Sequence, residues 1–270
     1  MTRHQLAHGE IVHARVEDVY PMIAPGSVTL CHVDGPYGMG KAAWDKVKDL
    51  AAWYRPHIAE WGRICAPSAS VYLWNTAEGW AAIHPEMAAA GWTFAGLITW
   101  DKMHTLAQLG AERVTGPLDT TEVCGVYVRC SGRADGSVLG FSVWQMSEQA
   151  YRNERLRSGV ATPDRNPLRG MTFSALHPCQ KPLLFARRIV EASSRPGDLV
   201  FAPFGGTCRE AVAIEQMAAY DPATARRYIV VEQDEDGRNY IDAVLRQIRG
   251  LDPATCGPAG QVRLFPAGAR

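Results

Sequence analysis

The chain has 270 residues, of which 47% are hydrophobic and 21% charged, and its 28 basic and 28 acidic side chains cancel to a formal net charge of zero. These values are typical of a globular protein with a sizeable core, and they argue against a surface that is basic throughout. No apolar stretch reaches the ~18 residues of a membrane helix, the first residues lead into no signal-peptide core, and the seven cysteines form no Cys-x-x-Cys pair. We therefore expect a cytoplasmic protein with reduced thiols, no metal site and no membrane partner.

Strand-like and helical segments alternate along most of the chain, which is typical of an α/β fold with a mostly parallel sheet. The first half predicts a strand at 28–33, a helix at 50–61, a strand at 70–74, a helix at 78–90 and strands at 93–100 and 122–128. Residues 131–176 interrupt this pattern with glycine, serine, proline and arginine, and we expect a short helix there at 147–156. The second half predicts a helix at 183–193, a strand at 199–202, a helix at 209–218, a strand at 228–232 and a helix at 240–248. The proline- and glycine-rich residues 251–270 predict a loosely held tail.

The turn Asp34-Gly35-Pro36-Tyr37 follows the first buried strand. An exocyclic amine on a nucleobase is a poor nucleophile, because its lone pair is delocalised into the ring. Two acceptors on its hydrogens, the Asp34 carboxylate and the Gly35 carbonyl, would expose that lone pair while Tyr37 stacks on the base. Taken alone, such a turn is also common wherever a strand leads into a loop.

A second turn, Pro203-Phe204-Gly205-Gly206-Thr207, connects a buried strand to a helix. Glycines at this place let a ligand approach the backbone closely, although a purely structural turn would have the same sequence. Glu232 ends the next strand, where its carboxylate could accept hydrogen bonds from both ribose hydroxyls of an adenosine. An acid at a strand end is by itself more often a helix cap or a solvated side chain.

The run His177-Pro178-Cys179-Gln180-Lys181-Pro182 stands just ahead of the glycine turn. Together with the two turns and Glu232, it resembles the DNA adenine-N6/cytosine-N4 amino-methyltransferases, in the permuted order where the catalytic motif precedes the cofactor loop. The resemblance covers about residues 10–248. It implies a Rossmann-like fold that binds S-adenosylmethionine on a seven-stranded sheet, with a catalytic half at 1–130, a target-recognition insertion at 131–176, a cofactor-binding half at 177–250 and a flexible tail at 251–270.

The resemblance also implies roles for residues. The catalytic group would be Asp34, Gly35, Pro36 and Tyr37, and the S-adenosylmethionine site would comprise His177, Lys181, Phe204, Gly205, Gly206, Thr207 and Glu232, with Lys181 neutralising the cofactor carboxylate. Weaker similarities occur at Trp44-Asp45, Trp100-Asp101-Lys102 and Thr121-Glu122, and each of these could equally be packing or surface. Because Asp heads the motif of the family's adenine enzymes and Ser that of most cytosine enzymes, the expected product is N6-methyladenine in DNA. The target base would be flipped out of the duplex.

Three positions depart from the family pattern. Gly35 replaces a proline, Ala202 replaces the aspartate before the glycine turn, and Cys208 replaces a glycine that would allow close approach of the cofactor. These departures leave open a degenerate relative that binds DNA without catalysis, beside a cytosine-N4 enzyme. A nicotinamide oxidoreductase is the third alternative, although no Gly-x-Gly-x-x-Gly is present.

Charge is distributed unevenly along the sequence. Residues 151–195 contain nine basic and three acidic side chains, so this segment carries 9 − 3 = +6 and the rest of the chain −6. Such segregation is expected of a DNA-binding surface, although any single arginine could be a solvated helix residue. We expect the phosphate contacts to come from Arg152, Arg155, Arg157, Arg165 and Arg169. The oligomeric state, including a homodimer, stays open.

Overall fold

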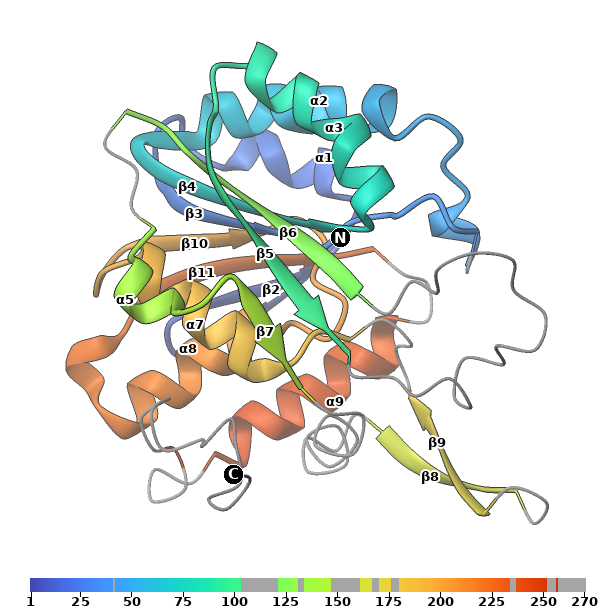
Figure 1. Cartoon of the computed structure of the whole chain (residues 1–270). Helices are drawn as coiled ribbons and strands as arrows, with labels where there is room; N and C mark the ends of the chain where they lie inside the picture. Colours follow the sequence, from blue (N-terminus) through green and yellow to red (C-terminus); the bar gives the residue numbers. More distant parts are fainter. Residues whose placement is uncertain are drawn as a thin grey trace, which may run out of the picture.

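The computed structural model describes residues 1–40, 42–102, 121–130, 134–146, 161–166, 170–175, 180–233, 237–251 and 256. A nine-stranded sheet runs through the molecule in the order β1-β2-β11-β10-β3-β4-β6-β5-β7 (Figure 1). Its strands are β1 (Thr2–Gln5), β2 (Gly9–His13), β3 (Val28–Val33), β4 (Cys65–Asn75), β5 (Thr93–Asp101), β6 (Thr121–Val128), β7 (Val143–Gln145), β10 (Leu199–Ala202) and β11 (Arg227–Glu232). Most neighbours are parallel, whereas β1 is antiparallel to β2 and β6 is antiparallel to both β4 and β5.

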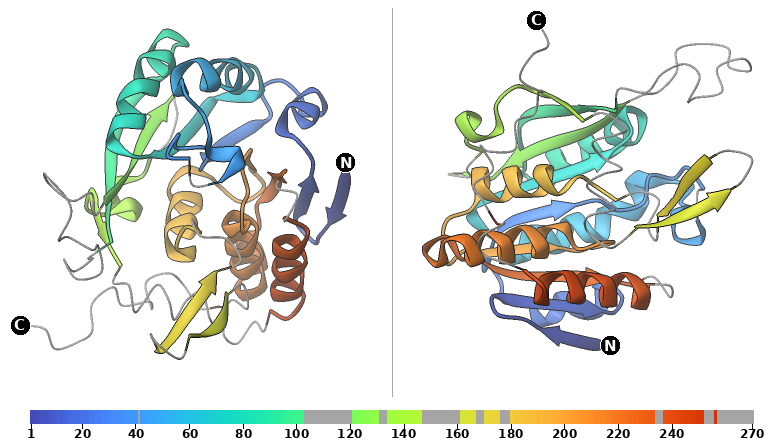
Figure 2. Two further views of the ribbon diagram at one scale, coloured as in Figure 1. Left: turned by 90° about the vertical axis from the view of Figure 1, so that its right-hand side faces the viewer. Right: turned by 90° about the horizontal axis from the view of Figure 1, so that it is seen from below.

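Helices cover both faces of this sheet (Figure 2). One face carries α1 (Val16–Val19), α2 (Leu50–Ile64) and α3 (Ala77–Ala89), and the other carries α7 (Leu183–Ser193), α8 (Arg209–Tyr220) and α9 (Gly237–Arg249). Successive strand residues point to opposite faces, so Leu30 packs into the core beneath α7 and α8 while Cys31 packs into the core beneath α2. The predicted α/β class is confirmed by this layered arrangement.

Two helices, α2 and α3, begin where a side chain satisfies one of their first amide groups. Asp49 precedes α2 and its carboxylate accepts a hydrogen bond from the Ala52 N–H at 2.9 Å, and Thr76 does the same for the Gly79 N–H of α3 at 3.0 Å. Of the helices that the structure describes, none combines the length and hydrophobicity needed to span a membrane.

The predicted elements of both halves are present, with ends that differ by a few residues. The largest difference is β4, which begins at Cys65 rather than at residue 70. The N-terminal hairpin of β1 and β2 was not predicted, and β2 pairs in parallel with β11, far away in sequence. The expected seven strands become nine in the described sheet because β1 and β7 extend its two edges.

The segment 131–176 contains short elements of its own. These are α5 (Gly136–Leu139), the edge strand β7, and a separate antiparallel pair formed by β8 (Ala161–Asn166) and β9 (Gly170–Ala175). In Figure 1 this pair stands away from the main sheet. The helix expected at 147–156 and most of the tail at 251–270 lie outside the described residues.

Candidate active site

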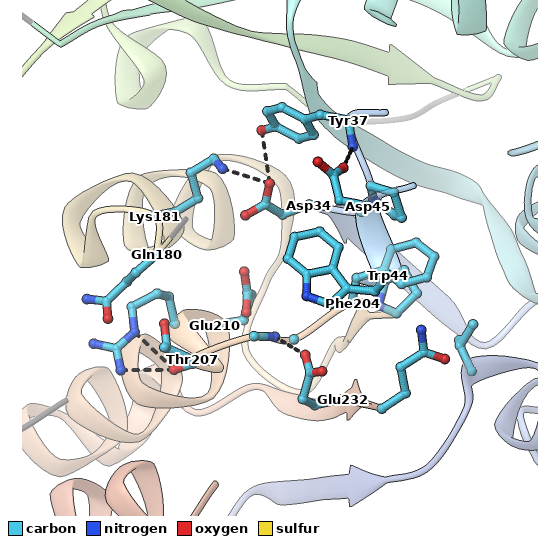
Figure 3. A pocket seen from close by; sticks show the side chains of 18 of the residues that line it. Asp34, Tyr37, Trp44, Asp45, Gln180, Lys181, Phe204, Thr207, Glu210 and Glu232 are labelled. Carbon is cyan, nitrogen blue, oxygen red and sulfur yellow. Dashed lines mark hydrogen bonds and ion pairs between the residues drawn. The ribbon is translucent and has the colours of Figure 1, made fainter. Parts of the chain in front are cut away.

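Asp34, the glycine turn and Glu232 meet at one edge of the sheet. Strands β3, β10 and β11 are neighbours and run parallel, so the residues that follow their carboxyl ends are brought together. A pocket of about 1040 Å³, its open mouth included, lies there (Figure 3). Its walls include every predicted catalytic or cofactor residue that the structure describes: Asp34, Gly35, Pro36, Tyr37, Lys181, Phe204, Gly205, Gly206, Thr207 and Glu232. His177 lies outside the described residues.

Hydrogen bonds from neighbouring elements hold the Asp34–Tyr37 turn in place. Asp45 Oδ1 accepts the backbone N–H of Tyr37 at 2.7 Å and that of Gly38 at 3.0 Å. The Pro36 carbonyl accepts the Tyr54 hydroxyl at 3.2 Å and the Asn75 amide at 3.3 Å. These contacts hold the residues that follow Gly35, the position where glycine replaces the family's proline.

Gly35 is required by the packing around it. A Cβ atom at this position would lie 2.5 Å from the Tyr54 hydroxyl oxygen and 2.9 Å from Phe204 Cδ2. Any larger residue must therefore displace the aromatic ring of the glycine turn or the tyrosine that fixes the Pro36 carbonyl. The replacement of proline by glycine thus agrees with the presence of Tyr54 and Phe204 beside the turn.

A group of charged side chains surrounds Asp34. Lys181 Nζ lies 2.7 Å from Asp34 Oδ1 and 3.0 Å from Glu122 Oε2, and Lys102 Nζ lies 2.7 Å from Glu122 Oε1. The Tyr37 hydroxyl is 3.0 Å from both carboxylates. The Lys181 ammonium thus pairs with two carboxylates of the catalytic side of the pocket, whereas we expected it to neutralise the cofactor.

Burial and neighbouring charges move the pKa values of these groups in opposite directions. Burial raises the pKa of Asp34, and Glu122 adds to that effect while Lys181 opposes it. Burial would also raise the pKa of Glu122, but the positive charges of Lys181 and Lys102 outweigh it and lower this pKa to about 2. The pKa of Lys181 is raised in spite of its burial, because both carboxylates stabilise the ammonium form. Glu122 is therefore an anion, and Asp34 is an acceptor whose ionisation depends on Lys181.

The glycine turn packs directly on β11. A Cβ atom at Gly205 would lie 2.4 Å from Val230 Cγ1, and the Gly205 N–H donates to the Val231 carbonyl at 2.6 Å. Gly206 has a φ of +48°, a left-handed conformation that favours glycine, and its N–H donates to the Glu232 carboxylate. The turn therefore presents a backbone amide and an acidic side chain together at the pocket wall.

Two expected weaknesses of this turn have different structural outcomes. Cys208 has a φ of +49°, which explains why glycine is usual here, but its side chain is fully buried in the core and does not line the pocket. The expectation that Cys208 narrows the cofactor site is therefore wrong. Ala202 is also buried, at 1% exposure, and supplies no carboxylate to the pocket.

The chemistry of the pocket walls suits S-adenosylmethionine, the cofactor that the sequence resemblance implies. Glu232 can accept hydrogen bonds from ribose hydroxyls, and Phe204 offers an aromatic surface. Within the described ranges, no three His, Cys, Asp or Glu side chains gather where a metal ion could be held. The residues present therefore fit an organic cofactor that carries a ribose and charged groups.

Three carboxylates that line this pocket received no role from the sequence: Asp45, Glu122 and Glu210. Glu122 is the second residue of β6, and because β6 is antiparallel to its neighbours, its first residues lie at the same edge as the ends of the parallel strands. A polar residue at the start of a strand was the available signal. Glu210, in the first turn of α8, gave no comparable signal, yet it lines the pocket.

The basic segment is divided by the fold. Arg187 pairs with Glu191 at 3.0 Å and Arg188 lies over the Trp144 ring at 5.6 Å, so these side chains and Lys181 serve the body of the protein. Arg165 belongs to β8, where the structure describes the backbone alone. The other arginines expected to bind phosphate, Arg152, Arg155, Arg157 and Arg169, lie outside the described residues.

Comparison with known proteins places these observations in a family. Residues 28–242 match the N6/N4 methyltransferase family described as DNA methylase. The chain is 23% identical over 266 residues to the type II methyltransferase M1.MboII of Moraxella bovis, covering 86% of this chain and 94% of the relative. It is 26% identical over 256 residues to the DNA adenine methyltransferase YhdJ of Escherichia coli K12, covering 88% and 82%.

The fold is shared with the solved structure of the PvuII DNA methyltransferase, which is described as cytosine-N4-specific. The TM-score is 0.66 at 13% sequence identity, over 92% of this chain and 95% of the other. The family match includes the catalytic turn, the glycine turn and Glu232, which together form one pocket. The chain therefore belongs to the N6/N4 DNA methylase family and is an S-adenosylmethionine-dependent DNA methyltransferase.

Proposed function

We propose that the protein transfers a methyl group from S-adenosylmethionine to the N6 amine of adenine in DNA. The observation that carries this proposal is the Asp34 carboxylate, which heads the turn and reaches the pocket from the end of β3. The adenine specificity of YhdJ, a relative over most of the chain, agrees with this base. The order of the motifs along the chain, with Asp34 before the glycine turn, also supports the permuted arrangement.

The acceptors for the amine would be Asp34 and the Gly35 carbonyl. Lys181 contacts Asp34 Oδ1 and opposes the rise that burial causes in the pKa of this carboxylate, and the contact leaves Oδ2 to accept a hydrogen from the amine. The Pro36 carbonyl is already bound by Tyr54 and Asn75, so it fixes the turn instead of binding substrate. When bound, the cofactor supplies an electrophilic methyl group, and the chain contributes orientation and proximity.

Tyr37 would stack on the flipped base from one side of this turn. Its hydroxyl is anchored by Asp34 and Glu122, and the Lys181 ammonium lies 5.2 Å from its ring centroid. The ring is thereby held at a fixed angle beside the acceptor. Flipping adenine out of a duplex costs a few kcal/mol, which contacts of this kind would offset.

The separate β8–β9 pair lies within residues 131–176, which supports the proposal that this segment recognises the target sequence. It stands outside the main sheet that forms the pocket, as a module that contacts DNA beside the flipped base would. The arginines of this segment would then contact phosphates and add a salt-dependent contribution to DNA affinity.

The proposal is tested by incubating the protein with labelled S-adenosylmethionine and mixed-sequence DNA and analysing the digested nucleosides. We expect N6-methyladenine, and labelled N4-methylcytosine would contradict the base assignment. The matched variants are Asp34→Ala, which should abolish turnover and keep cofactor affinity, and Glu232→Ala, which should lose cofactor affinity by about 1.5–3 kcal/mol. The reverse pattern in calorimetry would contradict the roles of both residues.

A further inference from the structure

A buried hydrogen-bonded row of three side chains ends at the cofactor pocket. The Trp74 indole N–H donates to His32 Nε2 at 2.8 Å, and His32 Nδ1 contacts Glu210 Oε1. An indole nitrogen can only donate, so His32 Nε2 is an acceptor and the ring hydrogen of the neutral imidazole lies on Nδ1, facing Glu210. The side chains of His32 and Glu210 are 1% and 8% exposed. The hydrogen bond from the buried His32 ring thus fixes the orientation of the Glu210 carboxylate.

Glu210 differs from the other acids of the pocket in what surrounds it. Asp34 and Glu122 are neutralised by lysines, and Asp45 accepts the amides of the catalytic turn. The Glu210 carboxylate, by contrast, contacts the imidazole of His32 at the pocket wall. In Figure 3 its carboxylate lies between the Lys181–Asp34 pair and the glycine turn that contacts Glu232. Glu210, Glu232 and Asp34 line the same pocket, so a ligand that spans from Glu232 toward Asp34 shares this pocket with the Glu210 carboxylate.

The Glu210 carboxylate could take the place of the aspartate that is missing at the end of β10. The aspartate that would receive the cofactor ammonium is replaced by Ala202, which is buried in the core. We propose that Glu210, oriented by His32, accepts the ammonium group of the methionine part of S-adenosylmethionine. Glu210 would thus be a binding residue supplied by the helix after the glycine turn, and His32 a positioning residue. The assignment rests on cofactor binding in this pocket.

The experiment compares two ligands that differ by the ammonium group alone. S-adenosylhomocysteine carries it, and 5′-S-(3-carboxypropyl)-5′-thioadenosine has the same atoms without it. Calorimetry with the full chain should show that the wild type prefers the first ligand by about ten- to a hundredfold, the factor expected for one charge-assisted hydrogen bond. Glu210→Gln should lose that preference and bind the deaminated ligand as the wild type does.

Two control variants separate the role of Glu210 from a general effect on the pocket. Glu232→Gln should weaken the binding of both ligands equally and keep the preference for S-adenosylhomocysteine. His32→Asn, which retains a hydrogen-bond donor toward Glu210, should keep more of the preference than His32→Leu. An unchanged preference in Glu210→Gln, or an equal loss of both ligands, would overturn the proposal. Failure of the wild type to bind S-adenosylhomocysteine would overturn the cofactor site itself.

Discussion

Replacing Lys181 by methionine removes a buried cation from between two carboxylates. The Lys181 side chain is 4% exposed, and its ammonium is within 3.0 Å of both Asp34 and Glu122. Methionine occupies similar space, so the main change is the loss of charge. Removing one partner of a buried ion pair costs about 3–5 kcal/mol. We expect a loss in the free energy of unfolding of about 3 kcal/mol at pH 7, because Asp34 is 23% exposed and Glu122 keeps Lys102 at 2.7 Å.

The loss should depend on pH. Without Lys181, burial and the charge of Glu122 drive the pKa of Asp34 further upward. A larger fraction of Asp34 is then protonated at pH 5 than at pH 7, so its repulsion with Glu122 is weaker at the lower pH. In the wild-type protein, Lys181 and Lys102 lower the pKa of Glu122 to about 2, so its contribution to stability is present above about pH 4.5 and does not change between pH 7 and 5. In the variant, Lys102 still pairs with Glu122 and opposes the rise of this pKa. The destabilisation should therefore be smaller at pH 5 than at pH 7.

Urea unfolding at the two pH values measures this effect, and the matched control is Lys102→Met. Lys102 is 24% exposed and contacts Glu122 at the edge of the same cluster, so we expect a loss of about 1 kcal/mol with little pH dependence. In methyl-transfer assays, the acid limb of the Lys181→Met rate profile should move to higher pH, because a protonated Asp34 no longer offers a carboxylate. A Lys181→Met loss equal to the control, or equal at both pH values, would refute this reasoning.

Three further predictions concern other parts of the chain. Gly35→Ala should destabilise the fold by about 1–3 kcal/mol, because the added methyl group clashes with Tyr54. The control Gly62→Ala has open space around it in α2 and should be neutral or stabilising by up to about 1 kcal/mol. Equal shifts of the melting temperature in the two variants would contradict the packing argument. Burial lowers the pKa of His57, so the unfolded chain takes up the proton first and stability falls below about pH 6.5. The His57→Gln variant should show a flatter dependence between pH 7 and 5 in urea unfolding, and retention of the wild-type slope would contradict this. Single alanine variants of the basic segment should each lower the salt slope of DNA binding by about one unit, and unchanged slopes in all five would place the DNA elsewhere: Arg152, Arg155, Arg157, Arg165 and Arg169.

Local sequence patterns were sufficient to predict most elements of the sheet and its helices. Buried strands such as Val28–Val33 are mostly apolar, and helices such as Leu183–Ser193 repeat apolar residues at helical spacing. Burial of one face therefore produces a periodic pattern of apolar residues that can be recognised in the sequence. The same patterns placed Asp34 and Glu232 at strand ends, where parallel strands deliver their functional residues to one edge. The hairpin of β1 and β2 was not predicted for two reasons. Its edge strand β1, Thr2–Gln5, is polar, and β2 pairs with β11, which is more than two hundred residues away in the sequence.

The partners of the charged side chains were decided by the tertiary structure. Lys181 is 147 residues from Asp34, and His32 is 178 residues from Glu210, and no local pattern links such positions. The strand order brings them together, and burial then requires each charge to find a partner. The direction of the Cys208 side chain was likewise unreadable, because it follows from a left-handed backbone at the start of α8. The sequence by itself determined which residues reach the pocket from strand ends, and the packing of distant segments decided which of them touch.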